Sequence, residues 1–315
     1  MAGPRPAIDV FELTKSFPGV LAADRISFQA NAGEVFGLVG PDGAGKTTTL
    51  RMLAGVLTPD SGSASVAGYD IREDPEGVKT QISYMPQRFG LYEDLTVDEN
   101  IRFYADVFGI SRMEREQRAR QLLQAAGMGP FGNRLAGKLS GGMKQKLGLV
   151  CALIHRPRVI LLDEPTNGVD PVSRRDFWHI LYSLLGEGIA IVMSTAYLDE
   201  AERCHRVALL HQGHILFCDA PSNLKMNLSG AVVAVISNEP RRLQEALATA
   251  EGILNVVLVA SGVRLIMDSA EVRIPELRAL ITDANVPFES IEQVVPTIED
   301  LFVAAVQEDS GRRHP

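Results

Sequence analysis

The sequence predicts an α/β fold in which strands alternate with helices, followed by a smaller α/β unit. Strongly apolar stretches of strand length occur at residues 34–39, 159–162 and 189–193, the pattern of parallel strands covered on both faces. Helical periodicity separates them, as in layered α/β proteins. After about residue 228 the chain reads as strand, helix, strand, strand, helix and strand, which predicts a compact appendage of the ferredoxin-like type.

Length and composition indicate a folded protein with one large core and a second, small domain. The chain has 315 residues, of which 46% are hydrophobic and 22% charged, near the averages of globular proteins. Single cores stop growing at roughly 250–300 residues, so two unequal units are expected. With 31 basic and 39 acidic residues the net charge is −8, so no general positive field attracts nucleic acid, and we expect no nucleic-acid partner.

The sequence favours a cytoplasmic protein. Its longest apolar runs, such as 159–162 and 231–236, are far shorter than the roughly 20 residues of a membrane-spanning helix. No basic start followed by an apolar stretch and a cleavage site is visible. Cys151, Cys204 and Cys218 lack the CxxC spacing of a metal site, which indicates reduced thiols in core or surface positions.

The expected elements follow in order. Short β-like stretches alternate with turns over residues 8–36, and the strand at 34–39 runs into a glycine-rich segment. A helix is predicted over 45–57, where apolar residues recur at spacings of three and four. Helical periodicity dominates residues 95–155, including the charge-rich segment 112–126, and we interpret this part as an inserted helical subdomain.

The C-terminal elements set the predicted domain boundaries. We expect strands at 231–237, 253–259, 263–267 and 291–295, and helices at 242–250 and 274–283. The domains predicted from these shifts are 1–229, with the helical subdomain at about 90–157, a small α/β domain at 230–307, and a polar tail at 308–315.

A phosphate-binding loop follows the strand at 34–39 and opens a helix. The segment matches G-x-x-x-x-G-K-[ST] in the context that this motif requires, and its residues are Gly40, Pro41, Asp42, Gly43, Ala44, Gly45, Lys46, Thr47 and Thr48. Glycines let the backbone wrap phosphate oxygens, and the helix N-terminus offers unpaired N–H donors. Lys46 would reach the β- and γ-phosphates, Thr47 would hold Mg²⁺, and Thr48 would contact a neighbouring phosphate. The alternative is a glycine turn with an exposed lysine.

An acidic pair follows the apolar strand at 159–162. Asp163 would deliver a carboxylate to the magnesium ion, and Glu164 would polarise the attacking water, because phosphoryl transfer depends on positioning and charge stabilisation. Such a pair can also be a helix cap or a turn. The phosphate-binding loop upstream favours the catalytic interpretation.

The segment 139–145, Leu-Ser-Gly-Gly-Met-Lys-Gln, predicts a second anion site at a helix N-terminus. Ser140 can cap a helix whose apolar face comprises Met143, Leu147, Val150 and Ile154. Gly141 and Gly142 leave the first N–H groups of this helix uncovered for an anion.

At this point the sequence resembles the ATPase subunits of ABC transporters, for which LSGG followed by a glutamine-containing helix is diagnostic. The motif order also agrees: the phosphate loop, then 84–87, the LSGG segment, Asp163–Glu164, and 167–170. The resemblance covers about residues 8–228. It implies the P-loop NTPase fold of an ABC cassette, with a mixed sheet and an inserted helical subdomain, and it implies ATP and Mg²⁺ as ligands.

The resemblance implies a head-to-tail pair of ATPase domains. Ser140, Gly141 and Gly142 would then contact the nucleotide of the partner domain. Phe17 matches the aromatic that stacks on adenine, although it could be a core phenylalanine. Gln87 resembles the glutamine that touches Mg²⁺, takes part in catalysis and links the site to a permease. Residues 88–92 would help to form the groove for that permease, or else belong to the core of the helical subdomain.

Two positions depart from the family pattern. Ala196 stands where a histidine normally contacts the γ-phosphate, and alanine offers no donor; losing one such contact costs on the order of 10²–10³ in rate. Asp42 replaces the usual asparagine and places a carboxylate near phosphate. We therefore hypothesise an asymmetric pair in which this chain's own pocket is degenerate and the opposite pocket is catalytic.

The function implied by the resemblance is that of an exporter motor. The residues of these motifs look most like those in the first half of fused two-ATPase subunits that serve ABC-2 type exporters of drugs, lipids or related small molecules. Its partners would be a second ATPase domain, an ABC-2 type permease and a periplasmic adaptor, at the cytoplasmic face of the inner membrane. Two alternatives are a catalytically weak regulatory ATP sensor and a soluble ABC protein that acts on ribosomes or DNA. The C-terminal unit would set dimer contacts or regulation, or act as a stability cap.

Overall fold

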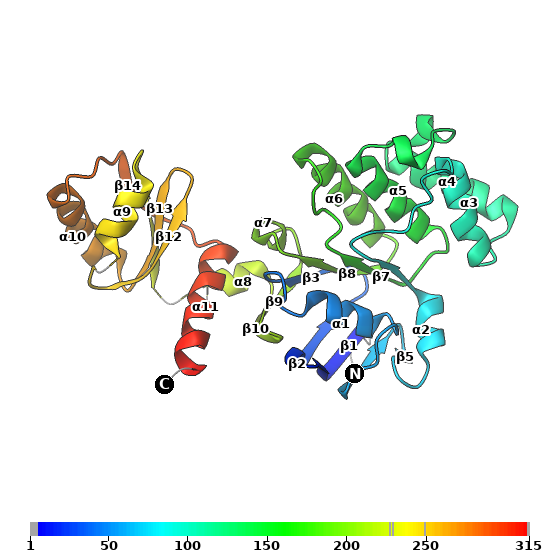
Figure 1. Ribbon diagram of the computed structural model, residues 1–315, viewed down its shortest axis with the longest axis horizontal. Helices are drawn as coiled ribbons and strands as arrows, with labels where there is room; N and C mark the ends of the chain where they lie inside the picture. Colours follow the sequence, from blue (N-terminus) through cyan, green and yellow to red (C-terminus); the bar gives the residue numbers. More distant parts are fainter. Residues whose placement is uncertain (1–5, 227, 229, 249, 314–315) are drawn as a thin grey trace. The chain divides into compact units, whose positions relative to one another are not determined.

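The computed structural model describes residues 6–226, 228, 230–248 and 250–313. The chain divides into two compact units, Met1–Cys218 and Asp219–Pro315, and each has a hydrophobic core of its own (Figure 1). Within the described ranges, no helix has the length and apolar composition needed to cross a membrane.

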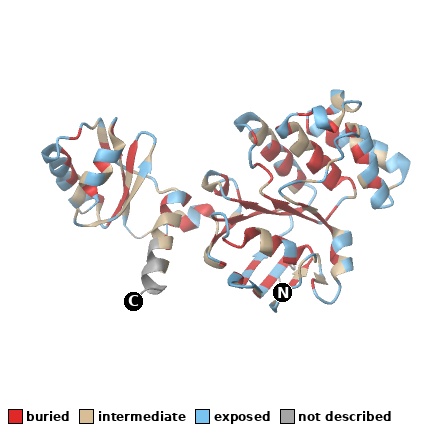
Figure 2. Cartoon of the chain, viewed as in Figure 1, coloured by how far each residue is buried: buried red, intermediate tan, exposed pale blue. Residues whose placement is uncertain are grey.

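Two sheets build the first unit. The six-stranded sheet has the order β10-β9-β3-β8-β7-β6, and its strands are β3 (Val35–Val39), β6 (Ile82–Met85), β7 (Val159–Asp163), β8 (Ala190–Thr195), β9 (Arg206–His211) and β10 (His214–Asp219). Its central pairings, β9-β3, β3-β8, β8-β7 and β7-β6, are parallel. All residues of β3, β7 and β8 are buried, as Figure 2 shows for the centre of this unit, so the predicted parallel strands are confirmed.

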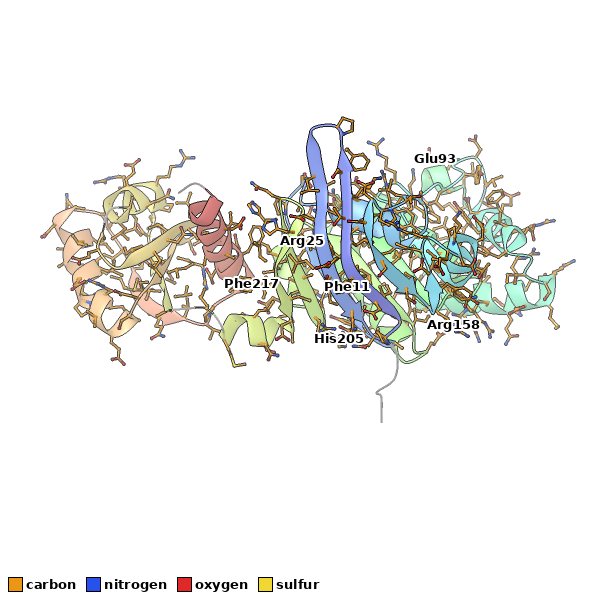
Figure 3. All side chains as sticks on the ribbon, turned by 90° about the horizontal axis from the view of Figure 1, so that it is seen from below. Phe11, Arg25, Glu93, Arg158, His205 and Phe217 are labelled. Atoms are coloured by element: carbon orange, nitrogen blue, oxygen red, sulfur yellow. The ribbon has the colours of Figure 1, made fainter. Side chains whose placement is uncertain are left out.

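The second sheet of this unit has the order β2-β1-β4-β5. It comprises β1 (Ile8–Phe17), β2 (Val20–Ala30), β4 (Ser61–Val66) and β5 (Tyr69–Asp70), paired antiparallel. Alternate residues of β1 and β2 enter the core while those between them face outward, as expected of a half-buried sheet. Phe11, on the outward face, is 64% exposed (Figure 3).

Helix α1 (Lys46–Leu53) lies between the two sheets and joins them into one core (Figure 1). Leu50 and Leu53 are both fully buried, which agrees with the predicted apolar face. The helix ends earlier than the predicted 45–57, because Ala54 caps it and Gly55 takes a left-handed backbone with φ +64°.

A layer of helices covers the other face of the six-stranded sheet (Figure 1). It contains α3 (Val97–Val107), α4 (Arg112–Ala125), α5 (Gly141–Leu153) and α6 (Pro171–Leu185), and the short helices α2 (Pro75–Gln81) and α7 (Leu198–Ala201) complete the unit. Local signals start these helices: Thr96 and Glu99 form a capping box at α3, and Asp170 caps α6 by accepting from Val172 N and Ser173 N. The helical segment predicted around 95–155 is therefore present.

The second unit is a four-stranded antiparallel sheet with the order β12-β13-β11-β14. Its elements are α8 (Pro221–Met226), β11 (Ala231–Ile236), α9 (Pro240–Leu247), β12 (Ile253–Val259), β13 (Gly262–Met267), α10 (Ala270–Asp283), β14 (Ser290–Val294) and α11 (Ile298–Arg313). The βαββαβ order and this pairing are those of a ferredoxin-like fold, as the sequence predicted. Residue 249 of the predicted helix 242–250 lies outside the described residues.

The predicted tail at 308–315 is wrong in part, because α11 continues through Arg313; residues 314–315 lie outside the described residues. Thr297 and Asp300 form reciprocal hydrogen bonds at the start of the helix, and Leu301 and Ala305 are buried. A capped and anchored first turn removes the cost of nucleation, so each further residue adds one hydrogen bond. Polar composition alone did not reveal this.

Asp300 anchors α11 through an ion pair with Arg264 of β13. The carboxylate is 1% exposed and lies 2.7 Å from the guanidinium. Burial alone would raise the pKa of Asp300, but the hydrogen bonds from Arg264 and Thr297 outweigh it and hold the pKa below the ordinary value. A carboxyl with a lowered folded-state pKa stabilises the fold above its ordinary pKa, and this stabilisation is lost as the pH falls through the folded value.

Asp300→Asn should lower the free energy of unfolding of the second unit by about 2–3 kcal/mol, because it leaves Arg264 without its counter-charge. Amide hydrogen exchange of β11 and β13 at neutral pH measures this change, with the exposed neighbour Glu299→Gln as the control. The difference from the unmodified chain should fade as the pH falls below the ordinary Asp value of 3.8. An equal effect of the two variants would contradict the role of the ion pair.

Candidate functional site

The loop between β3 and α1 follows a path that requires glycine at two positions. A Cβ on Gly40 would lie 2.2 Å from the Leu210 carbonyl oxygen, and one on Gly45 would lie 2.2 Å from that of Ala22. Gly45 also has φ +102°, a backbone region that favours glycine. The close approach of β2 and β9 therefore fixes the loop above the carboxyl end of the sheet.

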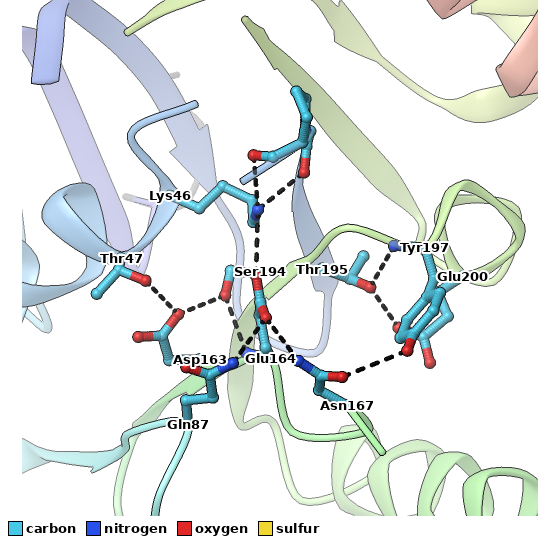
Figure 4. A network of polar contacts seen from close by, with 12 residues as sticks. Lys46, Thr47, Gln87, Asp163, Glu164, Asn167, Ser194, Thr195, Tyr197 and Glu200 are labelled. Atoms are coloured by element: carbon cyan, nitrogen blue, oxygen red, sulfur yellow. Dashed lines mark hydrogen bonds and ion pairs between the residues drawn. The ribbon is translucent and has the colours of Figure 1, made fainter. Parts of the chain in front are cut away.

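Lys46 lies under this loop and is only 4% exposed. Its Nζ donates to the carbonyl oxygens of Gly40 (2.8 Å) and Pro41 (3.0 Å), and it lies 3.2 Å from Glu164 Oε1. A buried ammonium needs such partners, because burial without them is costly. The predicted cation and the predicted catalytic carboxylate are thus brought together (Figure 4).

Asp163 lies at the end of β7 with its carboxylate enclosed by hydroxyl groups. Thr47 Oγ1 donates to Asp163 Oδ1 at 2.9 Å, Ser194 Oγ donates to the same oxygen at 2.7 Å, and the Tyr84 hydroxyl donates to Oδ2 at 3.3 Å. Burial, followed by the charge of Asp163, raises the pKa of Tyr84, so this hydroxyl stays protonated at neutral pH. Thr47 and Asp163, predicted as metal ligands, are therefore adjacent.

The oxygen atoms at Thr47 and Asp163 suit a Mg²⁺ ion. This metal prefers oxygen ligands and usually takes one or two protein groups beside water and substrate phosphates. Within the described part of the chain, no group of three or more His, Cys, Asp or Glu side chains could hold a metal. Thr47, Asp163 and Gln87, the predicted metal ligands, would supply oxygen atoms to a divalent ion together with phosphate oxygens, a set that fits magnesium.

Glu164 has a backbone conformation that is uncommon for a residue with a side chain. Its φ is +49°, which costs roughly 1–2 kcal/mol for such residues. Its N–H is held by Ser194 O (3.2 Å) and Ser194 Oγ (3.0 Å). Gln87 Nε2 and Asn167 Nδ2 donate to Glu164 Oε2 at 3.1 and 3.2 Å. These contacts and Lys46 hold the carboxylate at the mouth of the loop (Figure 4).

An open pocket of about 400 Å³ lies over the phosphate loop. Its lining comprises Phe17, Val20, Ala22, Asp42, Gly43, Ala44, Gly45, Lys46, Thr47, Thr48, Gln87 and Glu164. Phe17, at the tip of the β1–β2 hairpin, is 43% exposed, so it belongs to the pocket and not to the core. Val20 and Ala22 had no motif signal, because the hairpin alone brings them here.

The LSGG segment forms the start of α5, outside this pocket. Ser140 caps the helix by accepting from Met143 N at 3.3 Å. A Cβ on Gly141 would meet open space, whereas one on Gly142 would lie 2.3 Å from Ser173 Oγ. None of Ser140, Gly141 and Gly142 lines the phosphate-loop pocket of the same chain. The two predicted halves of the nucleotide site are therefore not brought together within one chain.

A smaller pocket of about 190 Å³ marks the position where a histidine was expected. It is lined by Asp42, Glu164, Thr166, Asn167, Thr195, Ala196 and Tyr197. Ala196 is exposed on its wall, so position 196 contributes a methyl group and no side-chain donor. Asp42 lines both pockets, so an acidic residue borders the space over the phosphate loop.

An aromatic groove lies beside residues 88–92. Phe89, Tyr104 and Phe108 line a pocket of about 210 Å³, and the Phe89 and Tyr104 rings are 5.1 Å apart. Tyr92 is 47% exposed and packs against Phe103. The cluster thus joins the helical layer and also presents aromatic surface, so it combines features of both interpretations given for 88–92.

Sequence reasoning missed the polar residues that support the site. Ser194, fully buried, joins the acidic pair, and the buried Glu200 accepts from Thr166 and Thr195. The signal available was positional: Ser194 and Thr195 end an apolar parallel strand, where ligand-binding residues gather in α/β sheets. No spacing rule identifies Glu200.

Comparison with known proteins gives consistent results. A family model described as "ABC transporter" matches residues 23–167. The probable multidrug ABC transporter ATP-binding protein YbhF of Escherichia coli (strain K12) is 45% identical over 296 residues, which are 92% of this chain and 50% of that protein. This chain thus spans about half the length of that relative.

A second relative is matched over most of its length. The daunorubicin/doxorubicin resistance ATP-binding protein DrrA of Streptomyces peucetius is 36% identical over 249 residues, 79% of this chain and 74% of that protein. Among solved structures, the dimeric structure of MJ0796, a bacterial ABC transporter cassette, matches with a TM-score of 0.62 and 25% identity. The match covers 68% of this chain and 98% of that chain.

Ser194→Ala should lower the free energy of unfolding of the first unit by about 1–3 kcal/mol, because Asp163 loses a buried donor and Glu164 N an acceptor. Urea titration followed by fluorescence reports on this unit, since Trp178 is the chain's one tryptophan and is buried in it. The control is Ser183→Ala, whose hydroxyl donates to the Ile180 carbonyl of its own helix; it should change stability by less than about 0.5 kcal/mol. Equal effects would show that the bridge is unimportant.

Proposed function

This chain belongs to the family of ABC transporter ATP-binding proteins, and on that premise we propose that it binds and hydrolyses ATP as the motor subunit of an exporter. The observation that carries the proposal is that the predicted ATP-site residues lie in two separate places on the chain. The phosphate loop and Glu164 line one pocket, and Asp163 is hydrogen-bonded to Thr47 of that loop. Ser140 and Gly141, by contrast, are exposed at the start of α5, outside this pocket. A complete site then needs a second ATPase domain.

In the proposed complex, the phosphate loop and Lys46 hold the triphosphate and Phe17 stacks on adenine. Backbone N–H groups at the start of α1 point toward the phosphates. Mg²⁺, when bound, would neutralise charge on the β- and γ-phosphate oxygens. Thr47, Asp163 and Gln87 would hold this ion. Lys46 would then move its donors from the Gly40 and Pro41 carbonyls toward phosphate.

Hydrolysis requires that water attack the γ-phosphorus in line with the leaving ADP. As the water oxygen bonds to the γ-phosphorus, the bond from phosphorus to the leaving ADP breaks and Glu164 accepts a proton from the water. The products are ADP and phosphate. Gln87 and Asn167 orient the carboxylate by donating to one of its oxygens. Lys46 stabilises the charge that develops on the transferring group.

The partner domain would supply Ser140, Gly141 and Gly142 across a head-to-tail dimer. Gly141 is exposed at the start of α5, where a helix N-terminus suits a γ-phosphate, and the MJ0796 cassette named above is dimeric. The partner is a second copy, a related subunit or a fused second half. The match to half the length of YbhF supports the comparison with one half of a fused two-ATPase subunit.

We further propose that an ABC-2 type permease docks on the aromatic groove at Phe89, Tyr104 and Phe108. This would hold the chain at the cytoplasmic face of the inner membrane, with a periplasmic adaptor as a further component. The names of YbhF and DrrA point to drugs, and related small molecules or lipids are the wider cargo class.

For the domains, the sequence composition supports an ATP-binding domain over residues 1–229, with its helical subdomain at about 90–157, and a C-terminal domain over 230–307 that sets dimer contacts or regulation. The division into compact units falls earlier, after Cys218, and the second unit includes α8 and the whole of α11.

A second candidate is a pair with one weak site. The space beside Ala196 and the carboxylate of Asp42 favour slow hydrolysis in this chain's own pocket. Its LSGG segment would then complete the catalytic pocket of the partner. A regulatory ATP sensor is the limiting case of the same arrangement.

Gly141→Asp should abolish ATP-dependent dimerisation and leave MgATP binding by the single chain unchanged. The new carboxylate would face the γ-phosphate of the partner, but its Cβ has open space within its own chain. Light scattering with a nonhydrolysable ATP analogue measures dimerisation, and titration with a fluorescent ATP analogue measures binding.

Gly129→Asp is the matched control, because a Cβ on Gly129 also meets open space, and it should dimerise normally. Loss of MgATP binding in Gly141→Asp, or dimerisation equal to the control, would argue against a shared site.

Ala196→His should raise ATP turnover by the purified chain at least about 10-fold, because it restores one preorganised donor of a kind worth on the order of 10²–10³ in rate. Steady-state phosphate release measures the change. Adding Glu164→Gln to this variant should remove the gain. If turnover stays unchanged while MgATP affinity is preserved, position 196 does not limit the reaction.

A further inference from the structure

Glu200 is a buried carboxylate to which the steps above assign no role. The residue is 0% exposed. Its oxygens accept from Thr166 Oγ1 at 2.7 Å, Thr195 Oγ1 at 2.6 Å and Trp178 Nε1 at 3.4 Å. A buried charge is tolerated only where donors surround it, so these contacts must persist for the fold to hold.

These contacts join the two loops that border the pocket of about 190 Å³ beside Ala196. Thr166 lies two residues after Glu164, and Thr195 ends β8 directly before Ala196. One carboxylate therefore fixes both loops against each other; Figure 4 shows its contact with Thr195.

Tyr197 is held by this arrangement through its backbone and its ring. Its N–H donates to Thr195 Oγ1 at 3.0 Å, and the Arg174 guanidinium stacks over its ring at 4.3 Å. Arg174 in turn lies 3.8 Å from Glu200 and 3.7 Å from Asp199. Such a stack restricts the ring to one orientation.

The Tyr197 hydroxyl points to Asn167, and Asn167 points to Glu164. The hydroxyl donates to Asn167 Oδ1 at 3.4 Å, and Asn167 Nδ2 donates to Glu164 Oε2 at 3.2 Å (Figure 4). An ionised carboxylate only accepts, so the amide nitrogen must face Glu164 and the amide oxygen must face Tyr197. The carboxylate thus selects the amide orientation, and the hydroxyl, by donating to Oδ1, holds Asn167 in that orientation.

We propose that Tyr197 is a positioning residue for hydrolysis, which acts through Asn167 to orient the Glu164 carboxylate. Ala196 offers no side-chain donor to the site. The next residue, Tyr197, is the one in this loop that reaches Glu164, through Asn167. The inference rests on the proposed function, because orienting Glu164 affects rate only if the chain hydrolyses ATP. Asn167 and Tyr197 are separated by 30 residues, and no motif links them.

Tyr197→Phe removes the hydroxyl and keeps the ring under Arg174. We expect kcat for ATP hydrolysis to fall about 3- to 10-fold, the effect of losing one neutral hydrogen bond, while KM for ATP changes less than twofold. The matched control is Tyr182→Phe, because the Tyr182 hydroxyl donates to the Arg203 carbonyl at 2.9 Å and lines neither pocket. The control should keep kcat and KM.

A double-mutant cycle tests the route through Asn167. Asn167→Ala alone should lower kcat, and adding Tyr197→Phe should lower it no further, because two members of one path are not additive. Additive losses, or a kcat for Tyr197→Phe equal to that of Tyr182→Phe, would overturn the proposal. Trp178 fluorescence confirms that each variant is folded.

A readout that does not depend on turnover is the side-chain amide resonance of Asn167 in ¹⁵N-labelled protein, assigned with Asn167→Ala. Tyr197→Phe should shift it and Tyr182→Phe should not; an unmoved resonance would overturn the proposal. Failure of the unmodified chain to bind MgATP would instead contradict the proposed function. Binding and turnover that Tyr197→Phe leaves unchanged would contradict only the role of Tyr197.

Discussion

The structure of the site depends on the register of three parallel strands that end side by side. In the pairing of β7 with β8, Asp163 lies opposite Ser194, and in that of β3 with β8, Val39 lies opposite Thr195. This register places the phosphate loop, the acidic pair and the β8 hydroxyls at one edge. A slip of one residue would turn every side chain of the slipped strand to the other face of the sheet, and Ser194 could no longer bridge Asp163 and the backbone of Glu164.

This arrangement buries charged side chains, and hydrogen bonds and ion pairs among the site residues offset the unfavourable desolvation. Lys46, Asp163 and Glu200 are each at most 4% exposed, and each has several polar partners. An isolated ion in such a place would destabilise the fold strongly. The same contacts that lower this penalty also fix the orientation of Glu164, so stability and the geometry of hydrolysis have a common origin. Ala196 and Asp42 interrupt the pattern where the γ-phosphate would lie.

The two units differ in how they relate to this site. The first contains all residues of the pockets discussed, with a core that runs through both sheets and α1. The second has a separate core built from its sheet, α9 and α10, and Asp300 ties its last helix to β13.

The sequence by itself determined the α/β class, the phosphate loop, the LSGG helix and the acidic pair, because each is a contiguous pattern whose chemistry follows from neighbouring residues. It also predicted the order of strands and helices in the second unit, although polar composition disguised the helix at 308–313. Only the tertiary structure decided which distant residues meet: Thr47 and Asp163 are 116 positions apart, and Thr166 and Glu200 are 34 apart. Such contacts depend on how the strands align in the sheet, and the spacing of residues along the sequence does not reveal this alignment.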